Sequence, residues 1–315
     1  MAVEEATGRP YEEARRHLRR DHRIKISKHS LETLTRTVGE YWLQHDQHRY
    51  EQLEQTTRIQ GLPQGVESQP PDQCVIFADG VMVHTDGAWH EARVGVVRTE
   101  RGDKTTKRTL VRMSDPQDFG HHLWTLAATQ GCHQATTCAF VGDGSHWLWR
   151  MCDRHFDNAI RILDFYHLAQ HVHQCAGVHF GEESEQAKQW ALATLGTLRA
   201  GQVEAALQQV EALSARGKLK RKAKHELVTY LTNNRDRMDY PRYEKLGLPI
   251  GSGEVESACK TLVQKRAKQA GMRWTKDGLE SLLRVRCAVA DDTYRLQFGH
   301  WPTNLTAWRK IQKAA

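Results

Sequence analysis

The chain has 315 residues, with 45 Lys and Arg against 38 Asp and Glu, a net charge of +7 and a pI near 9.0. This length suffices for about two domains, and the mean hydropathy of −0.67 excludes fibrous, collagen-like and wholly disordered proteins. No stretch offers the ~20 mostly apolar residues of a membrane span, and the N-terminus lacks the apolar core of a signal peptide. We therefore expect a cytoplasmic protein with no membrane partner.

The seven cysteines are odd in number and widely scattered, and none belongs to a C-x-x-C pair typical of zinc ribbons or redox motifs. This pattern predicts buried free thiols in a reducing compartment. The positive charge is modest overall but locally concentrated, which is compatible with a polyanionic partner.

Residues 1–60 are predicted to be helical. Tyr11, Ala14 and Leu18 follow helical spacing among several arginines, and a second helix begins after Ser30. The order resembles a helix-turn-helix that contacts DNA; the alternative is an amphipathic pair that packs on the next domain. Gly and Pro residues in 61–73 indicate a linker.

After the linker the apolar spacing changes to strict alternation, which predicts strands. Three strand candidates are followed by a helix, a strand, a second helix and a last strand. The predicted strands are 74–84, 89–99, 105–113, 135–141 and 160–165, and the predicted helices are 118–130 and 147–156. Asp86-Gly87 and Arg101-Gly102-Asp103 are hairpin turn signals between the first three.

This order predicts an α/β, ribonuclease H-like core over residues 74–167. Right-handed crossovers would place the fourth strand beside the first, giving a mixed sheet of three antiparallel strands followed by two parallel strands. Residues 168–248 carry only helical periodicity and are expected to form an all-α insertion, and residues 249–315 are expected to form C-terminal helices.

Six cations lie among the nine residues 216–224 of the insertion. Such a concentration suits contacts with the phosphates of a DNA backbone. The alternative is a solvated basic segment without a ligand. The candidate DNA-binding residues here are Lys218, Lys220, Arg221 and Lys222.

Two aspartates lie at sequence positions that suit a catalytic or metal-binding role. Asp79 follows the apolar run Val75-Ile76-Phe77-Ala78, where an ionised carboxylate is costly unless it is paired or binds a metal. Asp143 stands at the carboxyl end of a predicted parallel strand, where open α/β sheets place their ligands. The predicted strands are neighbours, so the two carboxylates would converge, and a divalent cation between them would relieve their repulsion.

A third carboxylate is expected from the helix that follows Gly251-Ser252-Gly253. Glu254 and Glu256 are both candidates, and because they lie about 200° apart around a helix, only one can face the site. Both faces are mixed, so periodicity favours Glu256 only slightly.

Asp164 closes the last predicted strand. Asp164 could orient a metal ligand or serve as an alternative ligand itself. The other interpretation is a structural role, in which Asp164 caps the next helix. His167 and His171 are four residues apart on one helical face, a spacing that could bind a metal, although packing or DNA contact is favoured because no third ligand lies at an obvious spacing.

Several of these segments resemble the bacterial DDE transposases of the ISKra-type insertion-sequence family. The matching segments, in family order, are Ala78-Asp79-Gly80-Val81-Met82, Gly142-Asp143-Gly144-Ser145-His146-Trp147-Leu148-Trp149, Ile162-Leu163-Asp164-Phe165-Tyr166-His167 with His171, Pro249 to Lys260, and Ala270-Gly271-Met272-Arg273-Trp274. Each segment alone is a weak signal, but five in order are a strong one.

The resemblance implies a catalytic and metal-binding triad of Asp79, Asp143 and Glu256. It implies phosphodiester hydrolysis at the ends of a mobile element, followed by attack of the freed 3′-hydroxyl on target DNA with two Mg²⁺ ions, for which Mn²⁺ can substitute. The expected partners are DNA and at least one further copy of the chain, in a bacterial, nucleoid-associated setting. Lys260, Arg273 and Trp274 are further candidate DNA contacts, with stacking of Trp274 on an unpaired base set against a place in the core.

The resemblance also implies further N-terminal sequence ahead of this chain. The alternative function is therefore a truncated or domesticated copy that binds DNA without cutting it. A host nuclease of the same fold, which cuts without strand transfer, is a third possibility.

Overall fold

The computed structural model describes residues 1–60 and 69–294, and at its centre lies a mixed sheet of five strands in the spatial order β3-β2-β1-β4-β5. The prediction of a mixed α/β sheet, with three antiparallel strands followed by two parallel ones, is confirmed. The strands are β1 (Gln73–Thr85), β2 (Ala88–Arg101), β3 (Lys104–Arg112), β4 (Thr137–Gly142) and β5 (Ile160–Leu163). Residues 61–68 of the predicted linker and residues 295–315 lie outside the described residues.

The antiparallel half of the sheet is long and turns where the sequence predicts. Strands β1 and β2 pair without interruption from Gln73↔Glu100 to Thr85↔Ala88. Asp86 and Gly87 both adopt positive φ, at 50° and 80°, as a two-residue turn requires if it is to match the twist of its strands.

The parallel half is shorter and uses helical crossovers. Helix α4 (Pro116–Thr129) leads to β4, and α5 (His146–His155) leads from β4 to β5. Asp115 caps α4, because its side chain accepts hydrogen bonds from the backbone N–H groups of Gln117 and Asp118. Strand β1 pairs with β4 as far as Phe77↔Val141, which fixes how the ends of these two strands align.

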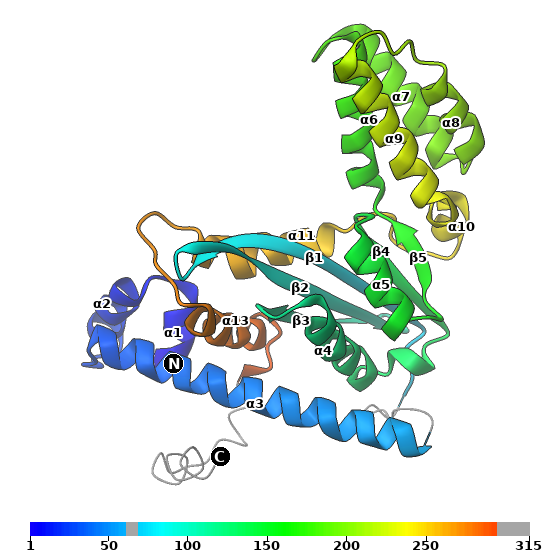
Figure 1. Cartoon of the computed structure of the whole chain (residues 1–315). Coiled ribbons are helices and arrows are strands. Elements are labelled where there is room, and N and C mark those ends of the chain that lie inside the picture. Colours follow the sequence, from blue (N-terminus) through cyan, green and yellow to red (C-terminus); the bar gives the residue numbers. More distant parts are fainter. Residues whose placement is uncertain (61–68, 295–315) are drawn as a thin grey trace.

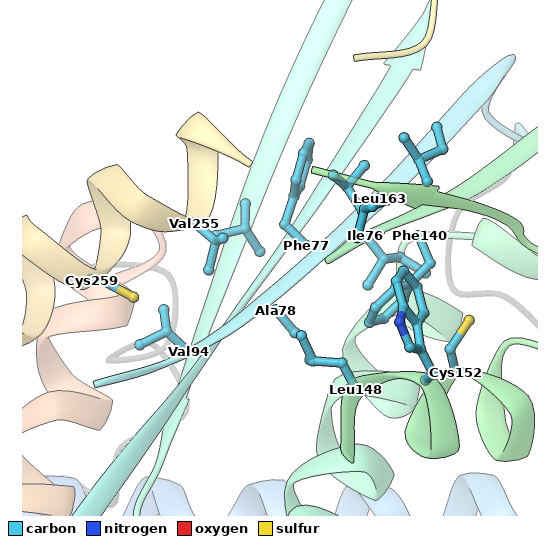
Figure 2. Packing of buried hydrophobic residues seen from close by; sticks show 14 of the residues in the cluster. Ile76, Phe77, Ala78, Val94, Phe140, Leu148, Cys152, Leu163, Val255 and Cys259 are labelled. Carbon is cyan, nitrogen blue, oxygen red and sulfur yellow. The ribbon is translucent and has the colours of Figure 1, made fainter. Parts of the chain in front are cut away.

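Helices cover both faces of the sheet (Figure 1). Gly95 of β2 lies opposite Ala78 of β1, and a Cβ at Gly95 would come within 2.6 Å of Leu123 in α4. On the other side of β1, Val255 and Cys259 pack against the strand, whereas Leu148 and Cys152 of α5 occupy the first side (Figure 2). Successive residues of a strand point to opposite faces, so Phe77 and Asp79 share the face opposite α4.

The helix on that second face contains a π-helical turn. It begins as α11 (Gly253–Ala258), continues as the π-helical turn η3 (Cys259–Gln264) and ends as α12 (Lys265–Ala267). A turn of this kind rotates the side chains that follow it relative to those before it, and π-bulges are frequent at functional sites. The predicted helix after Gly251-Ser252-Gly253 is thus present, with a change of register at Cys259.

Residues 165–245 form a helical arm that extends away from the sheet next to β5 (Figure 1). This arm corresponds to the predicted helical insertion. Its helices are α6 (Phe165–Phe180), α7 (Glu185–Arg199), α8 (Val203–Glu211), α9 (Lys218–Asn233), the short turn η2 (Arg235–Arg237) and α10 (Tyr240–Lys245).

The N-terminal helices are α1 (Ala2–Gly8), α2 (Tyr11–Asp21) and the 33-residue α3 (Lys28–Gln60). Helix α1 lies in the segment that was predicted to be helical, but it was not predicted as a separate helix. Val38 and Trp42 of α3 pack with Val285 and Ala288 of α13 (Lys276–Ala290) in one buried cluster. Packing of this segment against the rest of the protein, the alternative derived from the sequence, is therefore what the structure shows, and DNA contact by the segment stays a prediction.

One expectation about cysteine is wrong. Cys74 at the start of β1 and Cys132 in the short helix η1 (Cys132–Gln134) form a disulfide across 58 residues of sequence. Five cysteines remain as free thiols, as predicted; they are Cys138, Cys152, Cys175, Cys259 and Cys287. The pair escaped the sequence analysis because only the sheet topology brings the start of β1 beside the turn before β4.

Candidate active site

Asp79 and Asp143 occupy equivalent places on neighbouring strands. Each lies two residues beyond the last pair of the β1–β4 ladder, Phe77↔Val141. Parallel strands lie about 4.8 Å apart, and the charge of Asp143 contributes to the raised pKa of Asp79. The two aspartates therefore lie on neighbouring strands with their charges close enough to interact, and they line different cavities.

The Asp79 carboxylate has few partners for a half-buried charge. One oxygen accepts a hydrogen bond from the Gly80 N–H at 2.7 Å, and the other faces the Cys259 thiol at 3.6 Å. Burial is the main cause that raises the pKa of Asp79, and the nearby Asp143 charge adds to it. Burial and the neighbouring Asp143 charge thus both disfavour the ionised form of Asp79, and its carboxylate receives only these two contacts among the described residues.

The two candidate glutamates are separated clearly. Glu256 of α11 and Asp79 line one cavity of about 310 Å³, together with Cys259 and Lys260. Glu254 instead forms an ion pair with Lys107 of β3. Of the two carboxylates on α11, the structure places Glu256 beside Asp79 and engages Glu254 elsewhere.

The loop that carries Asp143 is held by the helical arm. The Tyr230 hydroxyl of α9 donates a hydrogen bond to the backbone carbonyl of Asp143 at 2.7 Å, and the Asp143 side chain accepts one from the Ser145 N–H at 2.8 Å. Gly144 adopts a φ of 97°, and a Cβ there would lie 2.8 Å from the Tyr230 ring. Both the positive φ and the lack of space for a Cβ beside Tyr230 require glycine at position 144.

Asp164 is a cap that also orders the start of α11. Its side chain is buried and accepts hydrogen bonds from the N–H groups of Tyr166 and His167, at 2.7 and 3.2 Å. Its second oxygen accepts from both the N–H and the hydroxyl of Ser252, which precedes α11. With all these donors engaged, the capping role is the one that the structure supports.

A larger cavity of about 820 Å³ lies between the arm and the Asp143 loop. His167 and His171 line it, with ring centroids 5.0 Å apart, and His171 stacks on Tyr230 at 4.0 Å. Burial lowers the pKa of His171 first, and the neighbouring His167 adds to the effect. The two histidines pack in the wall of a cavity that opens beside Asp143.

The predicted basic segment is the start of helix α9. Lys218, Arg221 and Lys222 are exposed there, and Lys222 also lines the larger cavity. Lys220 differs from them, since its ammonium donates to the carbonyl of His179 at 2.8 Å. Cations at a helix N-terminus oppose the helix dipole, so this cluster works against the stability of its own helix.

The remaining candidate DNA contacts divide into two kinds. Lys260 is exposed at the cavity of Asp79 and lies 3.4 Å from Glu256, and Arg273 is exposed too. Trp274 is partly buried, with the Arg266 guanidinium 4.9 Å from its ring centroid and the Tyr11 ring 6.4 Å away. These contacts favour a place for Trp274 in the core rather than against a base.

The sequence analysis missed three residues that shape the site. Cys259 donates to Asp79, Tyr230 holds the Asp143 loop, and Arg266 is buried between Tyr11 and Trp274. The spacing of Glu256 and Cys259, three residues apart on one helical face, was the one available signal for Cys259. Nothing local in the sequence marks Tyr230, which lies 87 residues from its partner.

In the described part of the chain, no helix is long and apolar enough to cross a membrane. No curated protein matches this sequence. The model described as "Uncharacterised protein family (UPF0236)" matches residues 1–302, which is nearly the whole sequence. The chain therefore belongs to the family UPF0236.

Proposed function

We propose that this protein is a metal-dependent DNA transposase of the DDE type, with Asp79, Asp143 and Glu256 as its catalytic carboxylates. The observation that carries the proposal is the separation of the two glutamates. Glu256 shares a cavity with the under-paired Asp79, next to Asp143, whereas Glu254 is engaged by Lys107.

The donor chemistry of these residues fits divalent magnesium. Three carboxylates from two neighbouring strands and one helix offer the oxygen ligands that Mg²⁺ prefers, and burial, followed by the Asp143 charge, raises the pKa of Asp79, two effects that a bound cation would offset. When bound, two Mg²⁺ or Mn²⁺ ions would activate the attacking oxygen and stabilise the leaving oxygen of a phosphodiester.

The protein's own residues would hold this arrangement in place. The Ser145 N–H orients the Asp143 side chain, and the Gly80 N–H orients that of Asp79. Asp164 ties the end of β5 to the turn before α11 and so positions the helix that carries Glu256. Each contact fixes a carboxylate before substrate arrives, which lowers the reorganisation needed for reaction.

The exposed cations near these residues would bind the DNA. Lys260 lies at the Asp79 cavity, and Lys218, Arg221 and Lys222 lie at the start of α9. Phosphates bound at that helix end would pair with the cationic side chains. They would also interact favourably with the helix dipole, which those cations oppose. Because two element ends must be brought together, the active form would be a dimer or a larger assembly.

The sheet order also supports this proposal. The order β3-β2-β1-β4-β5, with β1 parallel to β4, is the arrangement that the ribonuclease H-like fold would have. Asp79 and Asp143 each lie two residues beyond the end of the β1–β4 ladder, on the neighbouring first and fourth strands of this order. The resemblance to ISKra-type transposases rests on the same residues.

The test is DNA cleavage by the full chain on a plasmid that carries the gene with its native flanks, in Mg²⁺ or Mn²⁺. Asp79→Asn, Asp143→Asn and Glu256→Gln should each lower the rate by about 10³-fold or more, because lost metal stabilisation costs several kcal/mol. The matched control is Glu254→Gln, two residues away on the same helix, which should retain cleavage within a few-fold. Equal rates in Glu254→Gln and Glu256→Gln would contradict the assignment. DNA binding by the wild type with no cleavage in either metal would favour the non-catalytic DNA-binding copy instead.

A further inference from the structure

A second cluster of metal-ligating side chains lies far from the carboxylates of the proposed active site, between helices α1 and α2. Within the described ranges, the only group of three or more His, Cys, Asp or Glu side chains with ligand atoms within 4.8 Å of one another is Glu5, His17 and His22. Glu5 comes from α1, His17 from α2, and His22 is the residue at which α2 ends.

The two nitrogens of His17 face different groups. Its Nε2 lies 2.8 Å from Oδ2 of Asp21, one helical turn further on. Its Nδ1 lies 3.1 Å from Oε2 of Glu5, yet this nitrogen is buried and makes no hydrogen bond. When Nε2 carries the proton and donates it to Asp21, Nδ1 presents a lone pair toward an anionic oxygen.

Two electron-pair donors in contact without a hydrogen between them repel one another unless a cation lies between them. Zinc binds imidazole nitrogen and carboxylate oxygen at about 2.0–2.2 Å in tetrahedral geometry, which separates ligand atoms by about 3.3 Å. The 3.1 Å between Nδ1 and Oε2 is close to that spacing. His22 supplies a third donor, since its ring meets that of His17 edge to face with centroids 5.6 Å apart.

The surroundings complete the arrangement. A ligating histidine commonly donates its other N–H to a carboxylate, which fixes the ring and its tautomer, and Asp21 is placed to accept from Nε2 of His17. Two cations compete for these carboxylates: the Arg9 guanidinium lies 3.4 Å from the same Glu5 oxygen, and Arg20 donates to both oxygens of Asp21. His22 is exposed, so a fourth ligand position would be open to water.

We propose that Glu5, His17 and His22 form a zinc site that joins α1 to the C-terminal end of α2, with Asp21 orienting His17. The core beneath these helices is small; its buried members are Ala6, Tyr11, Ala14, Leu18 and Leu31. Small helical units often rely on a metal to hold such contacts together. The ion would fix the orientation of α2, whose exposed face carries Arg16 and Arg19.

The test is a zinc titration of the full chain after removal of bound metals with a chelator, in excess Mg²⁺ so that oxygen-ligand sites are occupied. Wild type should bind one more equivalent of Zn²⁺ than His17→Ala or His22→Ala. The matched control is His29→Ala, at an exposed position on α3, which should keep the wild-type stoichiometry. Asp21→Asn should keep the site but weaken Zn²⁺ binding by about 10–100-fold.

The variant His22→Ala should fold like wild type, because His22 is exposed and its loss leaves no cavity. Substitution of Co²⁺ adds a direct readout, since a tetrahedral cobalt centre gives visible absorption that should vanish in His22→Ala and persist in His29→Ala. Equal zinc stoichiometry and affinity in wild type, His17→Ala and His22→Ala would overturn the proposal. Because the readout is metal binding and not DNA cleavage, this result is independent of the proposed transposase activity.

Discussion

Asp79, within β1, and Asp164, directly after β5, are both at least partly shielded from solvent, but their carboxylates have very different numbers of hydrogen-bond partners. Asp164, at the end of β5, is 1% exposed and accepts hydrogen bonds from Tyr166, His167 and twice from Ser252. Asp79, on β1, receives one N–H and one distant thiol. Full satisfaction marks a carboxylate that organises the fold, and incomplete satisfaction marks one that retains free lone pairs for a ligand.

The physical basis of this difference is desolvation. A buried carboxylate loses its water and must be compensated by hydrogen bonds or by an opposite charge. Hydrogen bonds compensate Asp164, whereas the part-buried Asp46 of α3 is compensated by the guanidinium of Arg284 of α13, at 2.5 and 3.0 Å. Burial would raise the pKa of Asp46, but the Arg284 charge outweighs it and lowers this pKa.

The largest effect is expected at Asp46. Asp46→Asn removes the carboxylate that pairs with the part-buried Arg284, so the free energy of unfolding should fall by about 3 kcal/mol, the lower end of the range for breaking a buried pair. Urea denaturation at neutral pH measures this change, and Asp236→Asn, at an exposed aspartate, should stay within about 0.5 kcal/mol of wild type. Because the pKa of Asp46 is lowered, its contribution is present at neutral pH and lost on acidification. Equal stability of the two variants would show that the ion pair is not formed.

The next effect is expected at Asp164. Asp164→Ala removes the cap of α6 and leaves the Ser252 donors without their acceptor, which should cost about 2–3 kcal/mol. Cleavage should fall as well, since the turn before α11 loses its anchor. Thermal unfolding and cleavage rate, measured on the same sample below the unfolding transition, separate the two losses. A variant with wild-type stability would contradict the role of Asp164 as an organising carboxylate.

A smaller effect is expected at Tyr230. Tyr230→Phe keeps the ring beside Gly144 and the stacking on His171 but removes the hydrogen bond to the carbonyl of Asp143. Loss of one such bond should lower the free energy of unfolding by about 0.5–1.5 kcal/mol. Chemical denaturation measures this, with Tyr166→Phe, at an exposed tyrosine, as the control. Identical values for the two variants would remove Tyr230 from the support of the Asp143 loop.

The smallest change in the free energy of unfolding is expected at Asp79. Here the variant should gain stability relative to wild type as pH rises, whereas the variants above lose stability. Its pKa is raised by burial and by the Asp143 charge, so metal-free wild type loses stability as pH rises above the ordinary value of 3.8 through the folded-state value. Asp79→Asn lacks this titration and should therefore gain stability relative to wild type over the same rise. Unfolding curves at several pH values, in the presence of a chelator, give the comparison. A constant difference between the two proteins across this range would show that burial does not raise the pKa of Asp79.

Much of this comparison could be predicted from local sequence. Apolar alternation and turn residues such as Asp86-Gly87 predicted the strands and their order, because they reflect backbone preferences that act within a few residues. The neighbouring positions of Asp79 and Asp143 followed from that order. The sequence could not distinguish Glu254 from Glu256, because Lys107, the residue that engages Glu254, lies on a different strand 147 residues away.

Other features depend on tertiary contacts alone. The disulfide of Cys74 and Cys132 exists because β1 and η1 meet at one end of the sheet. The short helix α1 has no strong pattern of its own and is held by packing of Val3 and Ala6. The zinc site proposed between α1 and α2 was hidden for the same reason, since Glu5 lies in a helix that the sequence did not reveal.

The hydrogen bond from the Tyr230 hydroxyl to the Asp143 carbonyl connects the arm directly to the loop that carries Asp143. The arm leaves the core after Asp164 and returns before α11 (Figure 1), so both of its attachments flank the site. The basic start of α9 lies about 18 Å along the helix from Tyr230, at a rise of about 1.5 Å per residue. Any rotation of that helix must either break the bond or displace the Asp143 backbone. A phosphate or other ligand that displaced the arm would therefore act on the Asp143 backbone through this one hydrogen bond.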